Sequence, residues 1–316
     1  MSEELTFVEK EDQRLYNTSE KWYIREEWLH FARRRLAANG RTYIRYLTLT
    51  CSLAYDVIFL KDNGIIETTE IGYGENSVAF CEKDMQRSVL IRRRLPGAKF
   101  HPGPIEGLLG AGRINFSKKV DNWFPFDVIN IDICGAPFDQ HSQLMDAIRK
   151  LFVAQGMKDQ SFTLFVTTSA VEDGDSEENK QTLRNLIRQN YDITHFERIY
   201  HQRYPEDVID SYPEFLSIAI PKLIIDTGFR QGFNVECKKK FTYVGGKNRT
   251  QMMSFIFDCD LPRVVDTLTF LSTERPRKVV GILTHNLENV NNLLHGDGNK
   301  KARCEELKRM YGIEEQ

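Results

Sequence analysis

The chain has 316 residues, of which 41% are hydrophobic and 28% are charged, a composition that excludes disordered, collagen-like and low-complexity classes. No apolar run approaches the roughly 18 residues that a membrane-spanning helix needs. Lys and Arg total 43 and Asp and Glu total 45, so the net charge of −2 does not predict a general nucleic-acid coat.

The first expected element is a helix. The stretch from Asn17 to Ser19 offers capping oxygens, and apolar residues then recur at helical spacing from Ile24 to Leu36. Asn39 and Gly40 end this pattern. We therefore treat residues 1–40 as an N-terminal helical extension that packs as a lid or brace on the next part of the chain.

Five apolar segments rich in β-branched and aromatic residues predict strands. Their lack of strict alternation suits strands that are covered on both faces, as in a parallel sheet. Helical segments lie between them, which predicts right-handed βαβ units and a doubly wound α/β sheet. The strand segments are residues 43–50, 77–81, 98–101, 126–133 and 162–168, and the helical segments are 53–60, 85–95 and 142–155.

A further helix is expected after the fifth strand. Residues 191–211 are interpreted as an excursion over the carboxyl edge of the sheet. The helix then begins at Ser211 and Pro213, because proline suits the first turn, and it ends at Gly228. Pro221 is expected to kink it.

Two alternating runs, from Phe233 to Tyr243 and from Met253 to Cys259, predict an antiparallel hairpin. This order of elements resembles that of the class I S-adenosylmethionine-dependent methyltransferases, whose sheet closes with one antiparallel strand. The resemblance implies a mostly parallel, seven-stranded, Rossmann-like methyltransferase domain over residues 41–260. Residues 261–316 are expected to form a C-terminal helical appendage.

Cysteine and histidine spacing predicts no metal site. The six cysteines are scattered without a Cys-x-x-Cys pair, and the seven histidines show no metal-ligand spacing. The acidic amino-terminal segment lacks the basic and then apolar order of a signal peptide. We therefore expect reduced cysteines and a cytoplasmic protein.

The loop after the first strand is a candidate cofactor site. Ligands of doubly wound sheets bind at the carboxyl ends of the strands, where the strand order reverses. Thr50 and Ser52 are small, and the following helix offers backbone N–H groups. The methyltransferase resemblance implies that this loop holds the methionine part of S-adenosylmethionine. An ordinary strand-to-helix turn is the alternative.

Two acidic residues follow the next strands. Glu82 comes after the second strand, where one carboxylate can accept hydrogen bonds from both ribose hydroxyls. Its alternative role is a solvated turn. Glu106 comes after the third strand, where the resemblance implies a contact with the adenine amino group. A rigid Pro-Gly-Pro turn without a ligand role is the alternative there.

The fourth strand leads into the candidate catalytic residue, Asp132. Together with Gly135 and Pro137, it is similar to the signature of the tRNA guanine-N2 dimethyltransferase family, and more distantly to the Asp/Asn-Pro-Pro-Tyr loop of amino-directed DNA and RNA methyltransferases. The resemblance implies that Asp132 accepts a hydrogen bond from the target amino group. Ile133 and Cys134 stand where those families have a proline and an aromatic residue. A structural aspartate that caps the next turn is the alternative.

These residues favour two functions. The first is methyl transfer from S-adenosylmethionine to an unknown acceptor, with nucleic acid or protein as the expected partner and no membrane or metal. The second is a catalytically degenerate, methyltransferase-like scaffold or sensor in a larger assembly, because the first loop lacks glycine. Basic triplets at 33–35, 92–94 and 238–240 suit either phosphate contacts on a shared face or solvated surfaces.

Overall fold

A computed structural model gives the fold of this chain. The residues that it describes are 5–74, 77–110, 118–133, 135, 137, 144–172, 177–188, 194–205, 209, 211–245, 250–262 and 267–312. Two compact units divide the chain. Unit 1 comprises Met1–Asp132, Tyr243–Gln251 and Asn289–Gln316, and unit 2 comprises Ile133–Thr242 and Met252–Glu288.

The described residues form an eight-stranded sheet with the strand order β10-β8-β9-β7-β6-β1-β4-β5, and β2 and β3 form a separate hairpin. The predicted doubly wound α/β architecture is confirmed. The expected strand count of seven was too low by one, because the two-residue strand β10 (Glu288–Asn289) adds to the edge beside β8. So short a segment carries no apolar pattern that a sequence could reveal.

Four strands of the sheet in unit 1, β1, β4, β5 and β6, run parallel to one another. β1 pairs with both β4 and β6, and β4 pairs with β5. Because β1 lies between two strands that come later in the chain, the strand order reverses there. The bounds are β1 Tyr46–Thr48, β2 Thr68–Thr69, β3 Gly72–Tyr73, β4 Val78–Glu82, β5 Lys99–Pro102 and β6 Val128–Asp132.

The N-terminal extension contains two helices. The predicted one is α2 (Ser19–Ala38), whose N-cap Thr18 accepts a hydrogen bond from the Lys21 amide. An unpredicted helix, α1 (Phe7–Tyr16), precedes it and starts with a capping box between Thr6 and Glu9. That Thr-x-x-Glu pattern is the sequence signal that could have located α1.

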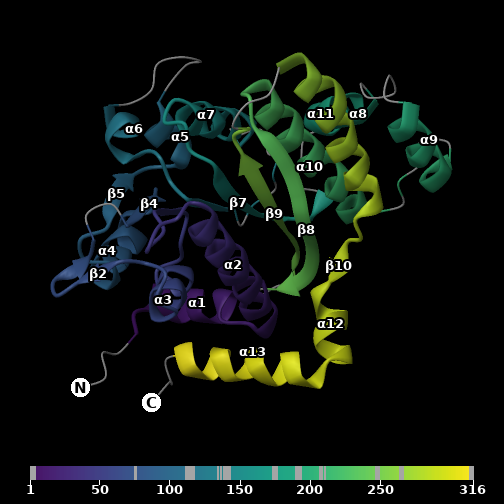
Figure 1. Ribbon diagram of the computed structural model, residues 1–316. Helices are drawn as coiled ribbons and strands as arrows, with labels where there is room; N and C mark the ends of the chain where they lie inside the picture. The colour runs from purple at the N-terminus through teal and green to yellow at the C-terminus, as the bar shows by residue number, and fades with distance from the viewer. Residues whose placement is uncertain are drawn as a thin grey trace. The chain divides into compact units, whose positions relative to one another are not determined.

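The other helices of unit 1 surround its strands. Trp22 of α2 stacks on Tyr311 of α13 with ring centroids 4.8 Å apart, so α13 packs on α2 (Figure 1). The bounds are α3 Tyr55–Asp62, α4 Met85–Arg94, α5 Ile105–Leu109, α6 Lys118–Trp123, α12 Val290–Gly296 and α13 Gly298–Tyr311.

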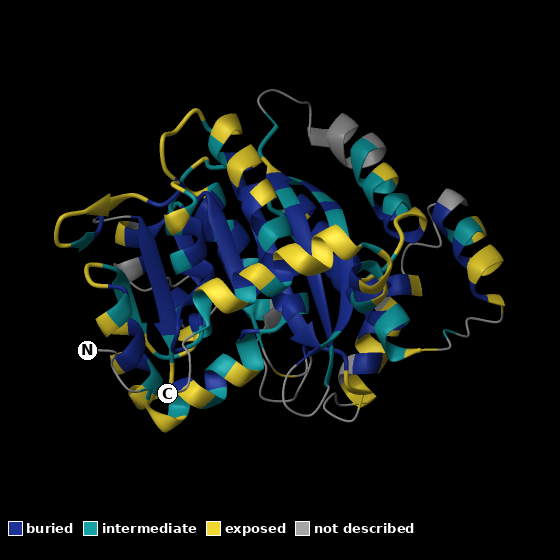
Figure 2. Ribbon diagram, turned by 90° about the horizontal axis from the view of Figure 1, so that it is seen from below, coloured by how far each residue is buried: buried dark blue, intermediate teal, exposed yellow. Residues whose placement is uncertain are grey.

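In unit 2, β7 runs antiparallel to β9, and α10 packs on α7, α8 and α11. Strands β1, β4, β6 and β7 are almost entirely buried, whereas many helices carry exposed residues on one face (Figure 2). The bounds are α7 Leu144–Gly156, β7 Phe162–Ser169, α8 Glu177–Arg188, α9 Thr194–Arg203, α10 Tyr212–Arg230, β8 Asn234–Gly245, β9 Thr250–Asp260 and α11 Thr267–Thr284.

Helix α10 starts where it was predicted to start but ends later. Ser211 is its N-cap and accepts a hydrogen bond from the Glu214 amide. Gly228, the predicted end, lies inside the helix. Glycine is required at this position because a side chain there would collide with Val235. None of the described helices combines the length and apolarity that a bilayer span requires.

A buried ion cluster joins α10 to α11. Lys222 is fully buried, and its ammonium contacts Asp226 one turn later. Arg275 donates to the same carboxylate, with a distance of 3.0 Å from Nε to Oδ1. Burial lowers the pKa of Lys222, because the charged ammonium has lost water. The carboxylate of Asp226 is therefore the shared partner of both cations in this cluster.

Replacing Asp226 with alanine is expected to lower the free energy of unfolding by about 3–5 kcal/mol, because it leaves Lys222 buried without its partner. Urea denaturation measures this change. The matched control is Glu274→Ala, which removes an exposed pair with Arg277 and is expected to cost less than about 1 kcal/mol. Equal losses in the two variants would show that the cluster is not a major stabilising contact.

Candidate functional site

The candidate site lies at the carboxyl edge of β4, β1 and β6. Thr48 of β1 is aligned with Phe80 of β4 and with Asn130 of β6. Glu82 and Asp132 each lie two residues beyond those partners, at the ends of their strands. The two residues therefore leave the sheet at the same edge on either side of β1, two strand spacings or about 10 Å apart.

Asp132 is paired with a lysine of the N-terminal extension. Lys21 of α2 lies 3.6 Å from its Oδ2, and both side chains are largely buried. The ammonium of Lys21 also lies 4.6 Å from the centre of the Tyr16 ring. The ion pair therefore ties α2 to the end of β6, and the carboxylate of Asp132 can accept further hydrogen bonds.

Glu82 is half-buried at the end of β4. Its Oε1 accepts a hydrogen bond from the Asp84 amide at 2.7 Å, and Asp84 in turn caps α4 by accepting from the Arg87 amide. Burial raises the pKa of Glu82, because the carboxylate has lost part of its hydration. A carboxylate has about four acceptor sites, so the contact with Asp84 leaves capacity for two hydroxyl donors.

The hydroxyl of Thr50 is used inside the protein. It donates to Asp56 of α3, which also accepts from Tyr46 at 2.8 Å and from Thr48 at 2.7 Å. Burial and the neighbouring Asp56 charge raise the pKa of Tyr46 well above its ordinary value. Sequence reasoning missed Asp56, although its position in the first turn of a helix after a threonine-rich strand was a usable signal.

The loop amide of Ser52 is bound by a carboxylate of the chain itself. The Ser52 N–H donates to Asp12 Oδ2 at 2.8 Å, and Arg87 donates to Asp12 Oδ1 at 3.0 Å. Both Ser52 and Asp12 are fully buried. Sequence reasoning did not find Asp12, because α1 was not predicted.

Two buried polar atoms near this loop have no hydrogen-bond partner among the described residues. They are the hydroxyl oxygen of Ser52 and the side-chain oxygen of Asn130. An unpaired buried polar group costs about 1–3 kcal/mol, so such atoms mark places where a ligand or a water molecule can bind.

Glu106 lies in the first turn of α5, which comes after β5, and its side chain is half-buried. Gly135 lies in unit 2, where its carbonyl accepts from the Thr168 hydroxyl and the Ser169 amide, each at 3.0 Å. Cys134 falls outside the described residues. The structure therefore does not describe the position where the related families have an aromatic residue.

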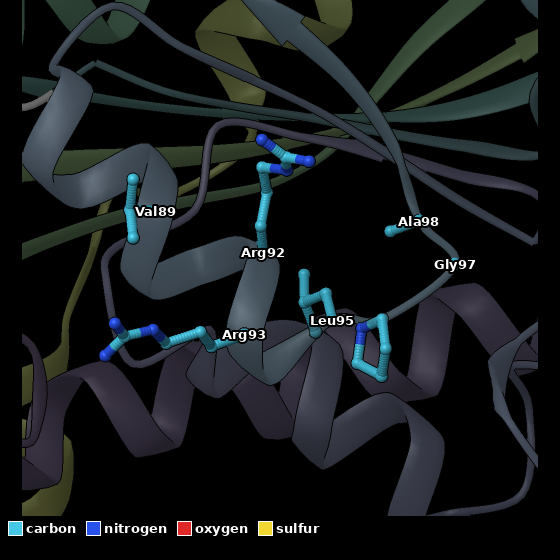
Figure 3. Close-up of a pocket in the computed structure, with 7 residues that line it drawn as sticks. Val89, Arg92, Arg93, Leu95, Gly97 and Ala98 are labelled. Carbon is cyan, nitrogen blue, oxygen red and sulfur yellow. The ribbon is translucent and has the colours of Figure 1, made fainter.

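A pocket of about 440 Å³ lies away from these carboxylates (Figure 3). It is formed by the end of α4 and the approach to β5, which belong to the amino edge of the parallel strands. Its lining residues are Val89, Arg92, Arg93, Leu95, Pro96, Gly97 and Ala98. In the part of the chain that the structure describes, no three His, Cys, Asp or Glu side chains cluster as metal ligands.

The two ends of S-adenosylmethionine fit this edge unequally. Glu82 and Glu106 are accessible carboxylates that suit hydroxyl and amino donors, as an adenosine provides. At the other end, the Ser52 amide that would meet the cofactor's carboxylate is already bound by Asp12.

No curated protein matches the chain in sequence. Among solved structures, N-methyltransferase NodS from Bradyrhizobium japonicum WM9 is 9% identical, with a TM-score of 0.37 and coverage of 74% of this chain and 95% of that chain. The plantazolicin methyltransferase BpumL, in complex with a triazolic desmethylPZN analog and SAH, is 13% identical, with a TM-score of 0.37 and coverage of 80% and 89%. The profile of a family described as PP_RS20740-like matches residues 20–280, and the chain therefore belongs to that family.

Proposed function

We propose that the protein binds an adenosyl sulfonium cofactor of the S-adenosylmethionine type at the carboxyl edge of β4, β1 and β6, and that it transfers the methyl group to an acceptor beside Asp132. The observation that carries this proposal is the placement of Glu82 and Asp132 on either side of β1. They flank the point where the strand order reverses, which is where doubly wound sheets bind their ligands.

Each carboxylate has a distinct role in this proposal. Glu82 accepts hydrogen bonds from the ribose hydroxyls, and Glu106 accepts one from the adenine amino group. Asp132 accepts from the N–H or O–H of the methyl acceptor and fixes its direction. Lys21 holds Asp132 in place through the ion pair.

The cofactor supplies an electrophilic methyl group when it is bound. Glu82 would hold the ribose hydroxyls, and Asp132 would hold the acceptor's N–H or O–H so that its lone pair faces that methyl group. The protein contributes mainly by positioning the reactants. Holding the reacting atoms in line raises the reaction rate by several orders of magnitude. Asp132 and Glu82 provide that alignment from two fixed strands.

A second candidate function is a scaffold or sensor that has lost catalysis. The observation that favours it is that side chains of the N-terminal helices already bind two groups of the site. Asp12 holds the Ser52 amide, and Lys21 holds Asp132. In that case the same edge serves protein assembly, with a partner protein in place of a methyl acceptor.

Replacing Glu82 with glutamine is expected to weaken binding of S-adenosylhomocysteine by at least tenfold. A hydrogen bond to a charged group contributes about 1.5–3 kcal/mol, and about 1.4 kcal/mol corresponds to a factor of ten. Isothermal titration calorimetry measures both affinities. Glu70→Gln, in the exposed β2–β3 turn, is the matched control and should leave the affinity unchanged. Absence of wild-type binding at millimolar ligand would reject the proposed cofactor, and equal affinities would reject the role of Glu82.

Replacing Asp132 with asparagine is expected to reduce methyl transfer by at least tenfold while S-adenosylhomocysteine still binds, because the amide is a weaker acceptor than the carboxylate. The measurement is incorporation of labelled methyl groups from S-adenosylmethionine into separated RNA, DNA and protein fractions. Wild-type binding of the cofactor without any incorporation would favour the scaffold over the enzyme.

A further inference from the structure

The pocket at the end of α4 lies on the opposite edge of the parallel strands from Glu82 and Asp132 (Figure 3). Its volume of about 440 Å³ is in the range of small-molecule binding sites. All of its lining residues belong to the stretch 89–98 of unit 1. The pocket is therefore formed within one unit, and it is separate from the site of the proposed methyl transfer.

Helix α4 carries four arginines, and they fall into two pairs. Arg87 and Arg94 form ion pairs with carboxylates of α1, at 3.0 and 2.6 Å. Arg92 and Arg93 line the pocket instead, and neither has a carboxylate partner in the part of the chain that the structure describes. The pocket therefore presents two positive charges that the described residues do not neutralise.

The two arginines of the pocket hold different positions. The Arg92 side chain reaches into the space between α4 and Ala98, and its guanidinium carbon lies 5.7 Å from the centre of the Phe100 ring (Figure 3). Arg93 is exposed and extends in another direction, at the rim. Because the ring attracts the guanidinium through its π face, the N–H donors of Arg92 can still bind an anion.

The rest of the pocket wall is apolar and is held in place by the backbone. Val89, Leu95 and Pro96 form this wall. The Leu95 amide closes the last turn of α4 with a hydrogen bond of 2.8 Å, and the Tyr73 amide of β3 donates to the Pro96 carbonyl at 2.8 Å. Neither bond uses an arginine side chain, so the wall is formed without a ligand and without the two arginines.

We propose that this pocket binds a small organic phosphate, with the phosphate on Arg92 and an apolar body against Val89, Leu95 and Pro96. A phosphate ester carries a charge of about −1.5 to −2 near pH 7, which matches two arginines better than the single charge of a carboxylate. The planar fork of a guanidinium also fits two phosphate oxygens at once. Arg93 adds attraction from the rim.

The test is calorimetric titration of the full chain with phenyl phosphate, which has no ribose and so does not use the contacts proposed for Glu82. It is expected to bind at least threefold more tightly than benzoate, which has a similar body and less charge, and than inorganic phosphate, which has no body. Equal binding of benzoate would overturn the preference for phosphate, and equal binding of inorganic phosphate would overturn the role of the apolar wall. Absence of binding at millimolar phenyl phosphate would overturn the site and leave the proposed function intact.

Substitutions locate the binding. Arg92→Gln is expected to weaken phenyl phosphate binding at least tenfold, because it removes a charged fork from inside the pocket. Arg93→Gln should weaken it by about two- to threefold, because a rim charge is screened by water and salt. The matched control is Arg14→Gln, which removes an exposed arginine of α1 outside the pocket and should leave the affinity unchanged.

Equal losses in the three variants would assign the effect to net charge and overturn the site. Thermal denaturation separates binding from folding. A less stable Arg92→Gln variant with unchanged affinity would show that Arg92 only stabilises the end of α4, where a cation interacts favourably with the helix dipole, and would overturn the proposal. If Arg92→Gln does not fold, Arg93→Gln and the wild-type ligand series decide it.

Discussion

The dominant constraint on unit 1 is that a carboxylate withdrawn from water must find donors inside the protein. Three aspartates meet it in three ways. Asp12 takes a backbone amide and an arginine, Asp56 takes three hydroxyls, and Asp132 takes a lysine. Asp12 and Asp132 join the N-terminal helices to the carboxyl edge of the parallel strands, and Asp56 joins α3 to β1 and the loop after it. The donors to these three aspartates therefore fix the carboxyl edge of the parallel strands and determine which polar groups it presents.

The N-terminal helices are consequently part of the site and do more than brace the sheet. α2 supplies the lysine at Asp132, and α1 supplies the carboxylate at the first loop. This arrangement explains how a loop without glycine is stable after β1. A glycine-rich turn allows a ligand to approach the backbone, whereas here a side chain of the same protein makes that approach. The two proposed functions then differ mainly in whether Glu82 and Glu106 bind a ligand.

Much of the sheet could be predicted because its signals are local. Apolar runs located the strands that end at Glu82 and Asp132, and alternation located the hairpin, so the edge on which both carboxylates lie could be deduced from the order of elements. Asp12 could not be recognised as part of the site, because its role depends on a contact 40 residues away that no periodicity records. Asp56 was missed although its contact with Thr50 is only six residues away. Gly228 was misplaced for a similar reason, since its small size serves the close approach of Val235 and not a helix end.

Unit 1 is closed by the last helix of the chain. The side-chain amide of Asn17 donates to the carbonyl of Lys308, 291 residues later, and Trp22 stacks on Tyr311. On the ribosome, the aromatic face of α2 therefore emerges long before α13 exists to cover it. Unit 1 therefore stays incomplete until all of unit 2 has been synthesised.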